Sequence, residues 1–376
     1  MPAPAPTRLA CAQGSFHLKR YPRRNPETLQ AWCGADLLLL EAASAQAADT
    51  LVVNDEHGAL CVAAAALALW TDSALAAQAM RENCERNDLA MPSVIWSTQP
   101  PPDTASRVLM RIPKQLRFFE YQLAHLAHCL APGTTVHFAG MDKHLSAQSA
   151  TLIERYFGAC ERHRGRKKAR LFTAVQRQRA APPGDFSSRY YCPQVGADLL
   201  SLANGFSREQ LDPGARMLLE SLHLIDPADS VADLACGNGV LGLAALRAGL
   251  AARVTFIDES AMAIAAAKHN SRNTGTQHHS VAFHHGDGLI GVDRRFDLIL
   301  CNPPFHLGHT VEDFAGRRLL TQCAQALTAQ GRLVIVANRH LDYALTLRKS
   351  FRKIRRLAEN NKFIVWLARD RHEPGA

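Results

Sequence analysis

In the second half of the chain, short apolar runs alternate regularly with helical segments. Val231–Leu234 is a compact apolar run, and a glycine-rich turn and the helical sequence VLGLAALRAGL follow it. Arg253–Ile257 and the alanine-rich segment Ala261–His269 repeat the pattern. The other runs with strand composition are Ser280–His284, Phe296–Cys301, Arg332–Ala337 and Phe363–Ala368. Alternation at this spacing predicts an α/β fold in which a parallel sheet carries helices on both faces.

The first half of the chain repeats this order of elements. Leu51–Asn54 has strand composition, and Gly58 lies in the turn that follows it. Later, VLMRIPKQLRFFE stands where LILCNPPFHLGHT stands in the second half, and CLAPGTTVHFAGMDKHL corresponds to ALTAQGRLVIVANRHL. This alignment puts Ile112 at the position of Asn302. We therefore expect a duplicated fold whose first copy, which lacks a glycine-rich turn, is chemically silent.

Positive charge is concentrated in a few segments of the chain, whose net charge is +9. Arg162–Arg179 holds eight Lys or Arg and no acidic residue, and Arg348–Arg356 holds a second cluster, which we assign to one helix. A block of this kind is either a solvated helix end and linker or a contact for phosphate. The helix-breaking stretch Ala180–Gly184 follows the first block. It predicts a boundary between a domain over 1–185 and a domain over 186–376.

Composition narrows the classes of protein to which the chain can belong. Apolar stretches such as Ala59–Trp70 are shorter than the about 20 residues that cross a membrane. The start of the chain, MPAPAPTRLA, lacks the apolar core that is typical of a signal peptide. Ten cysteines occur singly, which favours reduced thiols in a cytoplasm, and the 17 histidines show no ligand-like spacing. We expect a soluble cytoplasmic monomer that binds neither a metal nor a membrane.

A glycine-rich turn between a strand and a helix is the first candidate for a binding site. It contains Asp233, Ala235, Gly237, Asn238 and Gly239, in the sequence DLACGNG. Glycine lets a backbone approach a ligand closely, and the start of a helix presents free N–H groups. Such a turn also suits NAD, FAD or a tight turn without a ligand.

Two further carboxylates follow strands in the same half of the chain. Asp258 ends the strand after the turn, where a carboxylate can bind two ribose hydroxyls. Asp287, in the sequence HGDG, ends the third strand and can accept a hydrogen bond from an adenine amino group. Together with Asp233, acids at three successive strand ends indicate a nucleotide-like ligand rather than three unrelated helix caps.

Asn302, Pro303, Pro304 and Phe305 give the sharpest chemical prediction. The prolines fix the backbone, so that the Asn302 side-chain oxygen and the Pro303 carbonyl point into one pocket. Two acceptors suit a planar amino group, and Phe305 offers it a flat face for stacking. A nucleotide-dependent oxidoreductase has no use for this arrangement. The alternative without chemistry is a proline-rich strand exit with a core phenylalanine.

Together these residues resemble the class I S-adenosylmethionine-dependent methyltransferases that act on an amino nitrogen. Over nearly its whole length the chain resembles the bacterial ribosomal RNA guanine-N2 methyltransferases, which implies two tandem Rossmann-like methyltransferase folds, the first degenerate. The resemblance implies S-adenosylmethionine as cofactor, with its methionine part at the glycine turn, its ribose at Asp258 and its adenine at Asp287. The sequences NRHLDY and NNKF are similar to members that modify the large subunit, which implies guanine 1835 of 23S rRNA as target.

The same resemblance implies ribosomal RNA as the partner of the basic segments. We expect phosphate contacts from Arg166, Lys167, Lys168, Arg170, Arg339, Arg352 and Arg355. Naked or early-assembly RNA is the expected substrate, because a base is extruded most cheaply before tertiary packing. The alternatives are a guanine in 16S rRNA, an N6-adenine or protein glutamine target, and a non-catalytic RNA-binding assembly factor.

One position departs from the usual sequence of the family. Ala235 stands in the turn where glycine is usual. If this position requires a positive φ, alanine costs about 1 kcal/mol. Gly237 and Gly239 remain, so we expect weaker binding of the cofactor rather than its loss.

Overall fold

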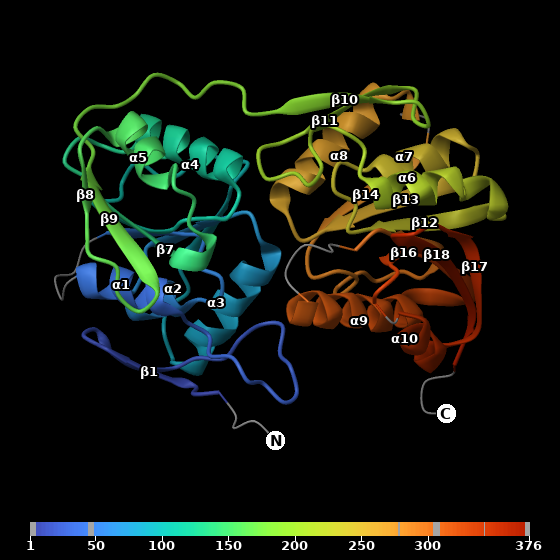
Figure 1. Ribbon diagram of the computed structural model, residues 1–376, viewed down its shortest axis with the longest axis horizontal. Helices are drawn as coiled ribbons and strands as arrows, with labels where there is room; N and C mark the ends of the chain where they lie inside the picture. Colours follow the sequence, from blue (N-terminus) through green and yellow to red (C-terminus); the bar gives the residue numbers. More distant parts are fainter. Residues whose placement is uncertain (1–4, 44–48, 277–278, 304–308, 342, 373–376) are drawn as a thin grey trace. The chain divides into compact units, whose positions relative to one another are not determined.

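A computed structural model describes residues 5–43, 49–276, 279–303, 309–341 and 343–372 of the chain. The chain forms two compact units, Met1–Phe186 (unit 1) and Ser187–Ala376 (unit 2), and each is described by itself (Figure 1). No helix among the described residues is long and apolar enough to span a membrane. In the same part of the chain, no group of three or more His, Cys, Asp or Glu is placed to hold a metal ion.

Unit 2 contains a seven-stranded sheet in the order β14-β13-β12-β15-β16-β18-β17. The first five strands pair in parallel, and β18 is antiparallel to both of its neighbours. The order reverses between β12 and β15, and such a switch point opens a crevice at the carboxyl ends of the strands. The strands are β12 (Ala228–Leu234), β13 (Ala251–Asp258), β14 (Ser280–His285), β15 (Phe296–Cys301), β16 (Leu327–Asn338), β17 (Phe351–Glu359) and β18 (Phe363–Arg371).

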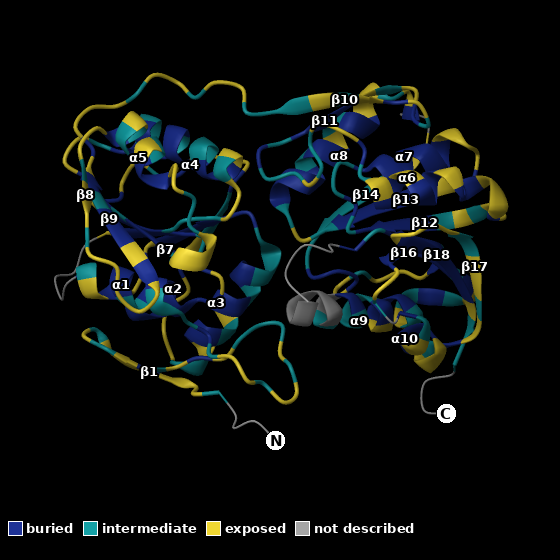
Figure 2. Ribbon diagram, viewed as in Figure 1, coloured by how far each residue is buried: buried dark blue, intermediate teal, exposed yellow. Residues whose placement is uncertain are grey.

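Helices cover both faces of this sheet (Figure 1). Leu298 and Leu300 of β15 belong to the core beneath one set of helices, and Ile299 and Cys301 belong to the core on the other face. This alternation follows from the two-residue period of a strand, and the central strands are buried on both sides (Figure 2). The first face carries α6 (Pro213–Glu220), α7 (Val240–Arg247) and α8 (Ala261–Asn273), and the second carries α9 (His309–Ala326) and α10 (Tyr343–Ser350).

Unit 1 has the same topology, with the strand order β5-β4-β3-β6-β7-β9-β8. Its strands are β3 (Thr50–Val53), β4 (Ala68–Thr71), β5 (Ser93–Trp96), β6 (Arg107–Arg111), β7 (Thr135–Met141), β8 (Cys160–Arg162) and β9 (Ala169–Val175). Its helices are α1 (Gly34–Ala42), α2 (Ala59–Ala63), α3 (Ala74–Arg86), α4 (Leu116–Cys129) and α5 (Ser149–Phe157). The repeated order in the sequence therefore reflects two copies of one fold, as predicted.

Each unit begins with a two-stranded hairpin that the sequence pattern did not predict. In unit 1 it consists of β1 (Arg8–Cys11) and β2 (Gly14–His17), and in unit 2 of β10 (Ser188–Cys192) and β11 (Ala197–Ser201). Both hairpins are antiparallel ribbons that form no part of the large sheets.

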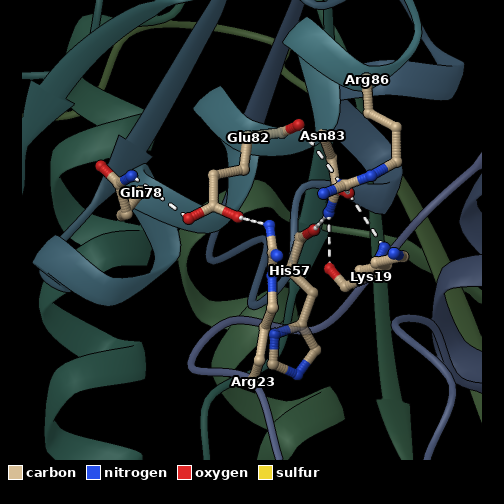
Figure 3. Close-up of polar contacts among 7 residues, drawn as sticks. All are labelled: Lys19, Arg23, His57, Gln78, Glu82, Asn83 and Arg86. Carbon is tan, nitrogen blue, oxygen red and sulfur yellow. Dashed lines mark hydrogen bonds and ion pairs between the residues drawn. The ribbon is translucent and has the colours of Figure 1, made fainter.

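In unit 1 a buried asparagine ties the chain after the hairpin to the turn before α2 (Figure 3). The amide of Asn83 donates to the carbonyls of Lys19 and His57 at 2.8 Å, and its oxygen accepts from the Lys19 N–H at 2.9 Å (Figure 3). Arg86 also donates to this oxygen, at 2.5 Å. Asn83 is completely buried, so these bonds satisfy a polar side chain inside the core.

In unit 2, Asn270 of α8 makes three bonds that correspond to those of Asn83 with Lys19 and His57. Its amide donates to the carbonyls of Leu200 and Asn238 at 2.9 Å, and its oxygen accepts from the Leu200 N–H at 2.8 Å. The hairpin of unit 2 is thereby fixed to the glycine-rich turn that precedes α7. The repeated asparagine shows that the two copies share a hydrogen-bonding frame as well as a strand order.

Two sequence predictions about the basic segments are wrong. The cluster at Arg348–Arg356 does not lie in one helix, because α10 ends at Ser350 and β17 begins at Phe351. Pairing with β18 along the sheet edge overrides the helical pattern. Likewise, the interpretation of Arg162–Arg179 as a helix end fails, because this block contains the end of β8, a tight turn and the whole of β9.

The predicted match between the halves is also shifted by one residue at the end of β6. Val53 pairs with Met110 in unit 1, and Leu234 pairs with Cys301 in unit 2. Arg111 therefore occupies the position of Asn302, and Ile112 the next one. A gap-free alignment of short apolar strands does not determine which residues correspond, whereas the backbone pairing of the strands in each sheet does.

Candidate active site

The glycine-rich turn follows β12 and leads into α7. Asp233 lies inside β12, and its carboxylate Oδ2 accepts a hydrogen bond from the Gly242 N–H at 2.8 Å, so that it caps the start of α7. Its other oxygen is buried and has no hydrogen-bond partner among the described residues. Burial raises the pKa of the Asp233 carboxyl to about 8. A cationic group near this oxygen would favour the ionised form.

The backbone of this turn is left-handed at three positions. Ala235 has φ +56°, Gly237 has φ +53° and Gly239, which precedes α7, has φ +85°. Ala235 therefore meets the condition under which alanine costs about 1 kcal/mol. A Cβ built on Gly237 meets no atom within 4 Å, so there is open space beside the turn.

Asp258 ends β13 beside the turn. Its Oδ2 accepts from the Gly237 N–H and its Oδ1 from the Ser260 N–H, both at 2.9 Å. These bonds fix the carboxylate beside the turn. Open space at Gly237, a fixed carboxylate and the unpartnered oxygen of Asp233 fit the ribose and amino-acid parts of S-adenosylmethionine.

The other two predicted cofactor residues have partners within the protein. Asp287 is almost fully buried after β14, and Arg318 of α9 donates to its carboxylate. The amide nitrogen of Asn238 donates to the hydroxyls of Tyr190 at 3.1 Å and Ser201 at 3.2 Å, which holds the hairpin against the turn. Burial raises the pKa of Tyr190 to about 12, so its hydroxyl stays neutral.

Asn302 follows β15, at the other side of the switch point. Its Nδ2 donates to the Asp212 carboxylate at 2.9 Å, and the same carboxylate oxygen accepts from the Ala215 N–H at the start of α6. Because the Asp212 carboxylate can only accept, the Asn302 side-chain atom that faces it is the nitrogen, and the other atom is the oxygen. A Cβ on Gly214 would lie 3.1 Å from that oxygen and 3.6 Å from the Phe363 ring, so glycine keeps the space around the amide clear.

The side-chain oxygen of Asn302 is a hydrogen-bond acceptor that lacks a donor among the described residues. This oxygen is also buried. A buried acceptor without a donor costs about 1–3 kcal/mol. The geometry is therefore suited to a ligand N–H. Pro304 and Phe305, the rest of the predicted tetrad, lie outside the described residues; Pro303 is described and is buried.

The NRHLDY and NNKF sequences meet at the carboxyl end of β16. The Arg339 N–H donates to the Lys362 carbonyl at 2.8 Å, and its guanidinium donates to the Asn360 carbonyl at 3.0 Å. Phe363 pairs with Asn338 in the sheet. The turn between β17 and β18 is thus attached to the end of the sheet at which Asn302 lies.

The basic residues predicted in the first block are largely paired with acids in unit 1. Glu41 accepts from Arg166 at 2.5 Å and from Lys167 at 2.6 Å, which lowers the pKa of Glu41. Arg170 forms an ion pair with Asp142 at 3.0 Å. Each of these pairs is exposed, and such pairs contribute little to stability.

The remaining predicted RNA contacts differ in their surroundings. Lys168 is exposed in the tight turn before β9 of unit 1, and Arg352 and Arg355 lie on β17, at the edge of the unit 2 sheet. Arg352 and Arg355 are exposed there, and no carboxylate among the described residues lies within ion-pair distance of them. Arg339 lies 3.8 Å from Glu359.

Sequence reasoning missed several residues that position the site. Asp212 and Gly214 flank a proline at the start of a helix, a pattern that predicts a helix start but not a contact with Asn302. Nothing in the sequence connects Arg318 with Asp287, or Asn270 with the hairpin. These contacts join segments that only the folded sheet brings together.

Comparison with known proteins matches both units. The RLMG N-terminal domain family matches residues 6–178, and the methyltransferase small domain family matches residues 196–367. A solved T. thermophilus 16S rRNA N2 G1207 methyltransferase, in complex with AdoMet and guanosine, matches with a TM-score of 0.77, and the match covers 97% of this chain and 98% of that chain. The identity is 18%, so this likeness concerns the fold.

Curated relatives extend over nearly the whole chain. Ribosomal RNA large subunit methyltransferase G of Alcanivorax borkumensis is 43% identical, with 94% of each chain covered. The protein of the same name from Pseudomonas paraeruginosa is 41% identical and covers 93% of this chain and 96% of its own. The chain belongs to the family of ribosomal RNA large subunit methyltransferase G.

Proposed function

We propose that the chain transfers the methyl group of S-adenosylmethionine to the exocyclic N2 of a guanine in 23S rRNA, at guanine 1835 by family resemblance. One observation carries the proposal. The Asn302 amide is oriented by Asp212, so that its buried oxygen faces the site without a donor. An amino group is the donor that this arrangement lacks, and the family membership indicates ribosomal RNA as its source.

The cofactor site lies at the glycine-rich turn. S-adenosylmethionine, when bound, supplies an electrophilic methyl group on its sulfonium. The Asp258 carboxylate accepts from the ribose hydroxyls, and the open space at Gly237 leaves room for the methionine part. Asp233 keeps its free oxygen near that part, where it favours a cationic amino group. Asp287, in its contact with Arg318, borders the adenine position.

The substrate amine lies at Asn302. The Asn302 oxygen and the Pro303 carbonyl accept its two hydrogens, which fixes the nitrogen lone pair toward the methyl group. The same acceptors stabilise the positive charge that grows on the nitrogen during attack. The methylated nitrogen then loses its proton to water, so no strong base is required. Phe305 is proposed to stack on the guanine, with Pro304 setting the backbone.

RNA is proposed to bind through exposed cations of both units. Lys168, Arg352 and Arg355 form no ion pair with any residue that the structure describes, so they can bind phosphate without the loss of such a pair. Arg166, Lys167, Arg170 and Arg339 would exchange weak exposed pairs for phosphate contacts, which release counterions. Such contacts set affinity rather than sequence choice.

Labelled S-adenosylmethionine tests the proposal. The wild type and Asn302→Ala are incubated with separated, deproteinised 23S and 16S rRNA, and the product nucleosides are resolved. We expect N2-methylguanine in 23S rRNA, with transfer reduced by about 100-fold or more in the variant. Asn273→Ala, which changes an exposed asparagine at the end of α8, is the matched control and should retain wild-type transfer.

Each other outcome assigns a different function. N2-methylguanine in 16S rRNA keeps the chemistry and changes the target. N6-methyladenine as the product would identify adenine, rather than guanine, as the substrate base. RNA binding without cofactor binding indicates an assembly factor. A parallel reaction with intact 50S subunits shows whether the substrate is free RNA or the assembled subunit. Labelling of the subunits alone would contradict the expectation that the substrate is naked or early-assembly RNA.

A further inference from the structure

A large groove opens on unit 2 at the amino ends of its strands. Its volume is about 1070 Å³. Its walls come from the segment before β12, the start of β16, the end of α10, the first half of β17 and the end of β18. The lining residues used below are Arg332, Arg348, Arg352, Lys353, Arg355 and Arg369.

The groove carries a large excess of positive charge. Arg332 pairs with Asp226 at 3.3 Å, and Lys353 pairs with Asp370 at 2.8 Å. The other four cations, Arg348, Arg352, Arg355 and Arg369, are exposed, and no carboxylate among the described residues lies within ion-pair distance of them. Like charges held together destabilise a protein unless a counter-charge binds, so this cluster indicates an anionic ligand.

Protection of the sheet edge does not account for these charges. β17 is an edge strand, and charged residues do discourage edge-to-edge pairing. The corresponding strand of unit 1, β8, is only three residues long, and its Arg162 pairs with Glu154 at 2.8 Å. The fold therefore tolerates a short edge of mixed charge, and the long basic edge of unit 2 is a separate feature.

Arginine is the main cation of the groove. Five of its six Lys and Arg side chains are arginines, Lys353 being the exception. A guanidinium binds phosphate in a bidentate manner, which an ammonium cannot do. The floor contains apolar side chains, among them Ile225, Ile354 and Leu367, which give the charged rim a low-dielectric base. Phosphate is the anion that suits this chemistry best.

The groove is distinct from the proposed active site. Arg332 pairs with Leu298 in the sheet, whereas Asn302 follows the carboxyl end of the same strand. At about 3.3 Å per residue, the groove begins about 13 Å before Asn302 along β15 and extends away from it. A ligand in the groove therefore cannot be the cofactor or the reacting base.

We propose that this groove binds the phosphodiester backbone of the RNA substrate at a point remote from the methylated base. The inference rests on the proposed function, which supplies an RNA chain long enough to reach both places. The RNA spans the side of unit 2 from the carboxyl ends of the strands to their amino ends. The groove then provides affinity, and the site around Asn302 provides the chemistry.

Salt-dependent binding of RNA tests the groove. A triple variant, Arg352→Ala, Arg355→Ala and Arg369→Ala, is compared with the wild type by fluorescence anisotropy, with a labelled 23S rRNA fragment that carries the target guanine and without cofactor. Each lost phosphate contact lowers the slope of log K against log salt by about 0.7–0.9. We expect a loss of about two to three in slope, an increase of about 100-fold or more in Kd near 0.1 M salt, and an unchanged Kd for S-adenosylmethionine.

The matched control removes the same charge elsewhere in unit 2. Arg247→Ala, Arg253→Ala and Arg294→Ala change three exposed arginines on α7, on β13 and before β15. The control should lower the slope by less than one. Equal losses in both triple variants, or RNA binding by the groove variant like that of the wild type, would overturn the proposal in favour of general attraction or an acidic protein partner.

The assay separates this proposal from the proposed function. If the wild type transfers no methyl group but its RNA binding depends on the groove, the proposed role of the groove is supported and the proposed methyl transfer is contradicted. If methyl transfer occurs and the groove variant keeps wild-type kcat/KM for RNA, the proposed role of the groove is contradicted and the proposed methyl transfer is supported. A groove variant with normal kcat at saturating RNA and a raised KM supports both.

Discussion

The turn after the first strand of each large sheet is left-handed at two corresponding positions in the two units. In unit 1, Asn54 has φ +60° and Gly58 has φ +79°; in unit 2, Ala235 has φ +56° and Gly239 has φ +85°. In both, the glycine precedes a helix. The residues between these positions differ completely, and Gly237, which is also left-handed, corresponds to Glu56, which is not. The two units therefore share the ends of the turn but not its middle.

A carboxylate caps the third N–H of the helix in both units, but from different positions. In unit 2, Asp233 reaches Gly242 from within β12. In unit 1, Asp55 reaches Cys61 from the turn itself, at 2.8 Å. Burial raises the pKa of Asp55 to about 6 and that of Asp233 to about 8. The capping acid therefore lies in the turn in unit 1 and in the preceding strand in unit 2.

Two other positions lose their chemistry in unit 1. Trp70 pairs with Val53 as Ile257 pairs with Leu234, which places Thr71 at the position of Asp258. Arg111 replaces Asn302, and its guanidinium forms an ion pair with Asp36 of α1 at 2.7 Å. The cavity beside Arg111 and His57 has a volume of about 40 Å³. Sites for small molecules occupy about 300–1,000 Å³, so this cavity is too small for a cofactor.

The difference teaches that a binding site can be lost while its frame persists. Asn83 and Asn270, the left-handed glycine and the helix cap all remain in both units. These features belong to the shared frame, whereas the exchanged positions include Asp258 and Asn302 of the site. Four substitution experiments separate the frame from the site, with effects that decrease from the first to the last.

The largest effect is expected at Asp258. Asp258→Ala removes a carboxylate that would form two charge-assisted hydrogen bonds with ribose, each worth about 1.5–3 kcal/mol. The affinity for S-adenosylmethionine, measured by titration calorimetry, should fall by about 100-fold or more. Thr71→Ala in unit 1 is the control and should leave one cofactor bound per chain with wild-type affinity. A second bound cofactor in the wild type would contradict the conclusion that unit 1 has no cofactor site.

The next effect is expected at Asp212. Asp212→Ala frees the Asn302 amide to rotate, and misplacement of a reacting group by about 1 Å costs about 100-fold in rate. The turnover number should fall by that factor, with an unchanged Kd for the cofactor. Ser73→Ala in unit 1 also removes a helix cap, since Ser73 accepts from the Ala76 N–H at 3.2 Å. If both variants lose the same activity, Asp212 acts only as a cap.

A smaller effect is expected from the repeated asparagine. Asn83→Ala and Asn270→Ala each abolish the three hydrogen bonds that the two asparagines have in common, and Asn83→Ala also abolishes the bond from Arg86. Each variant should lower the free energy of unfolding by about 2 kcal/mol. Only Asn270→Ala should also weaken cofactor binding, because it releases the Asn238 carbonyl in the glycine-rich turn. Chemical denaturation and calorimetry measure the two effects. Equal loss of cofactor affinity in both variants would show that the frame of unit 1 still serves the site.

Sequence reasoning predicted most of the parallel sheet and the duplication, because each strand is a short apolar run with a turn at its end. It missed β17 and both hairpins, whose residues alternate with charges or lie outside the periodic pattern. The glycine turn, Asp258 and Asn302 carry signals in their own neighbourhood. Asp212 reaches Asn302 across 90 residues. Contacts of that kind depend on the register of the sheet, which local patterns leave undetermined.

The smallest effect is expected at the left-handed position of the turn. Ala235→Gly removes the steric cost of a Cβ at φ +56° and should raise the free energy of unfolding by about 0.5–1 kcal/mol, after allowance for the greater freedom of glycine in the unfolded chain. In a unit of this size the gain corresponds to an increase of about 1–4 °C in Tm, measurable by calorimetry.

The same change in unit 1 should have the opposite sign. Asn54 tolerates φ +60° better than alanine does, and its side chain exchanges hydrogen bonds with Gln122 at 2.8 and 2.9 Å. Asn54→Gly gives up those bonds and should destabilise the protein by about 1 kcal/mol. Opposite signs would show that unit 1 stabilised its turn with a side chain where unit 2 keeps a strained alanine beside the open space at Gly237. Equal signs would show that strain in the turn is unrelated to the site.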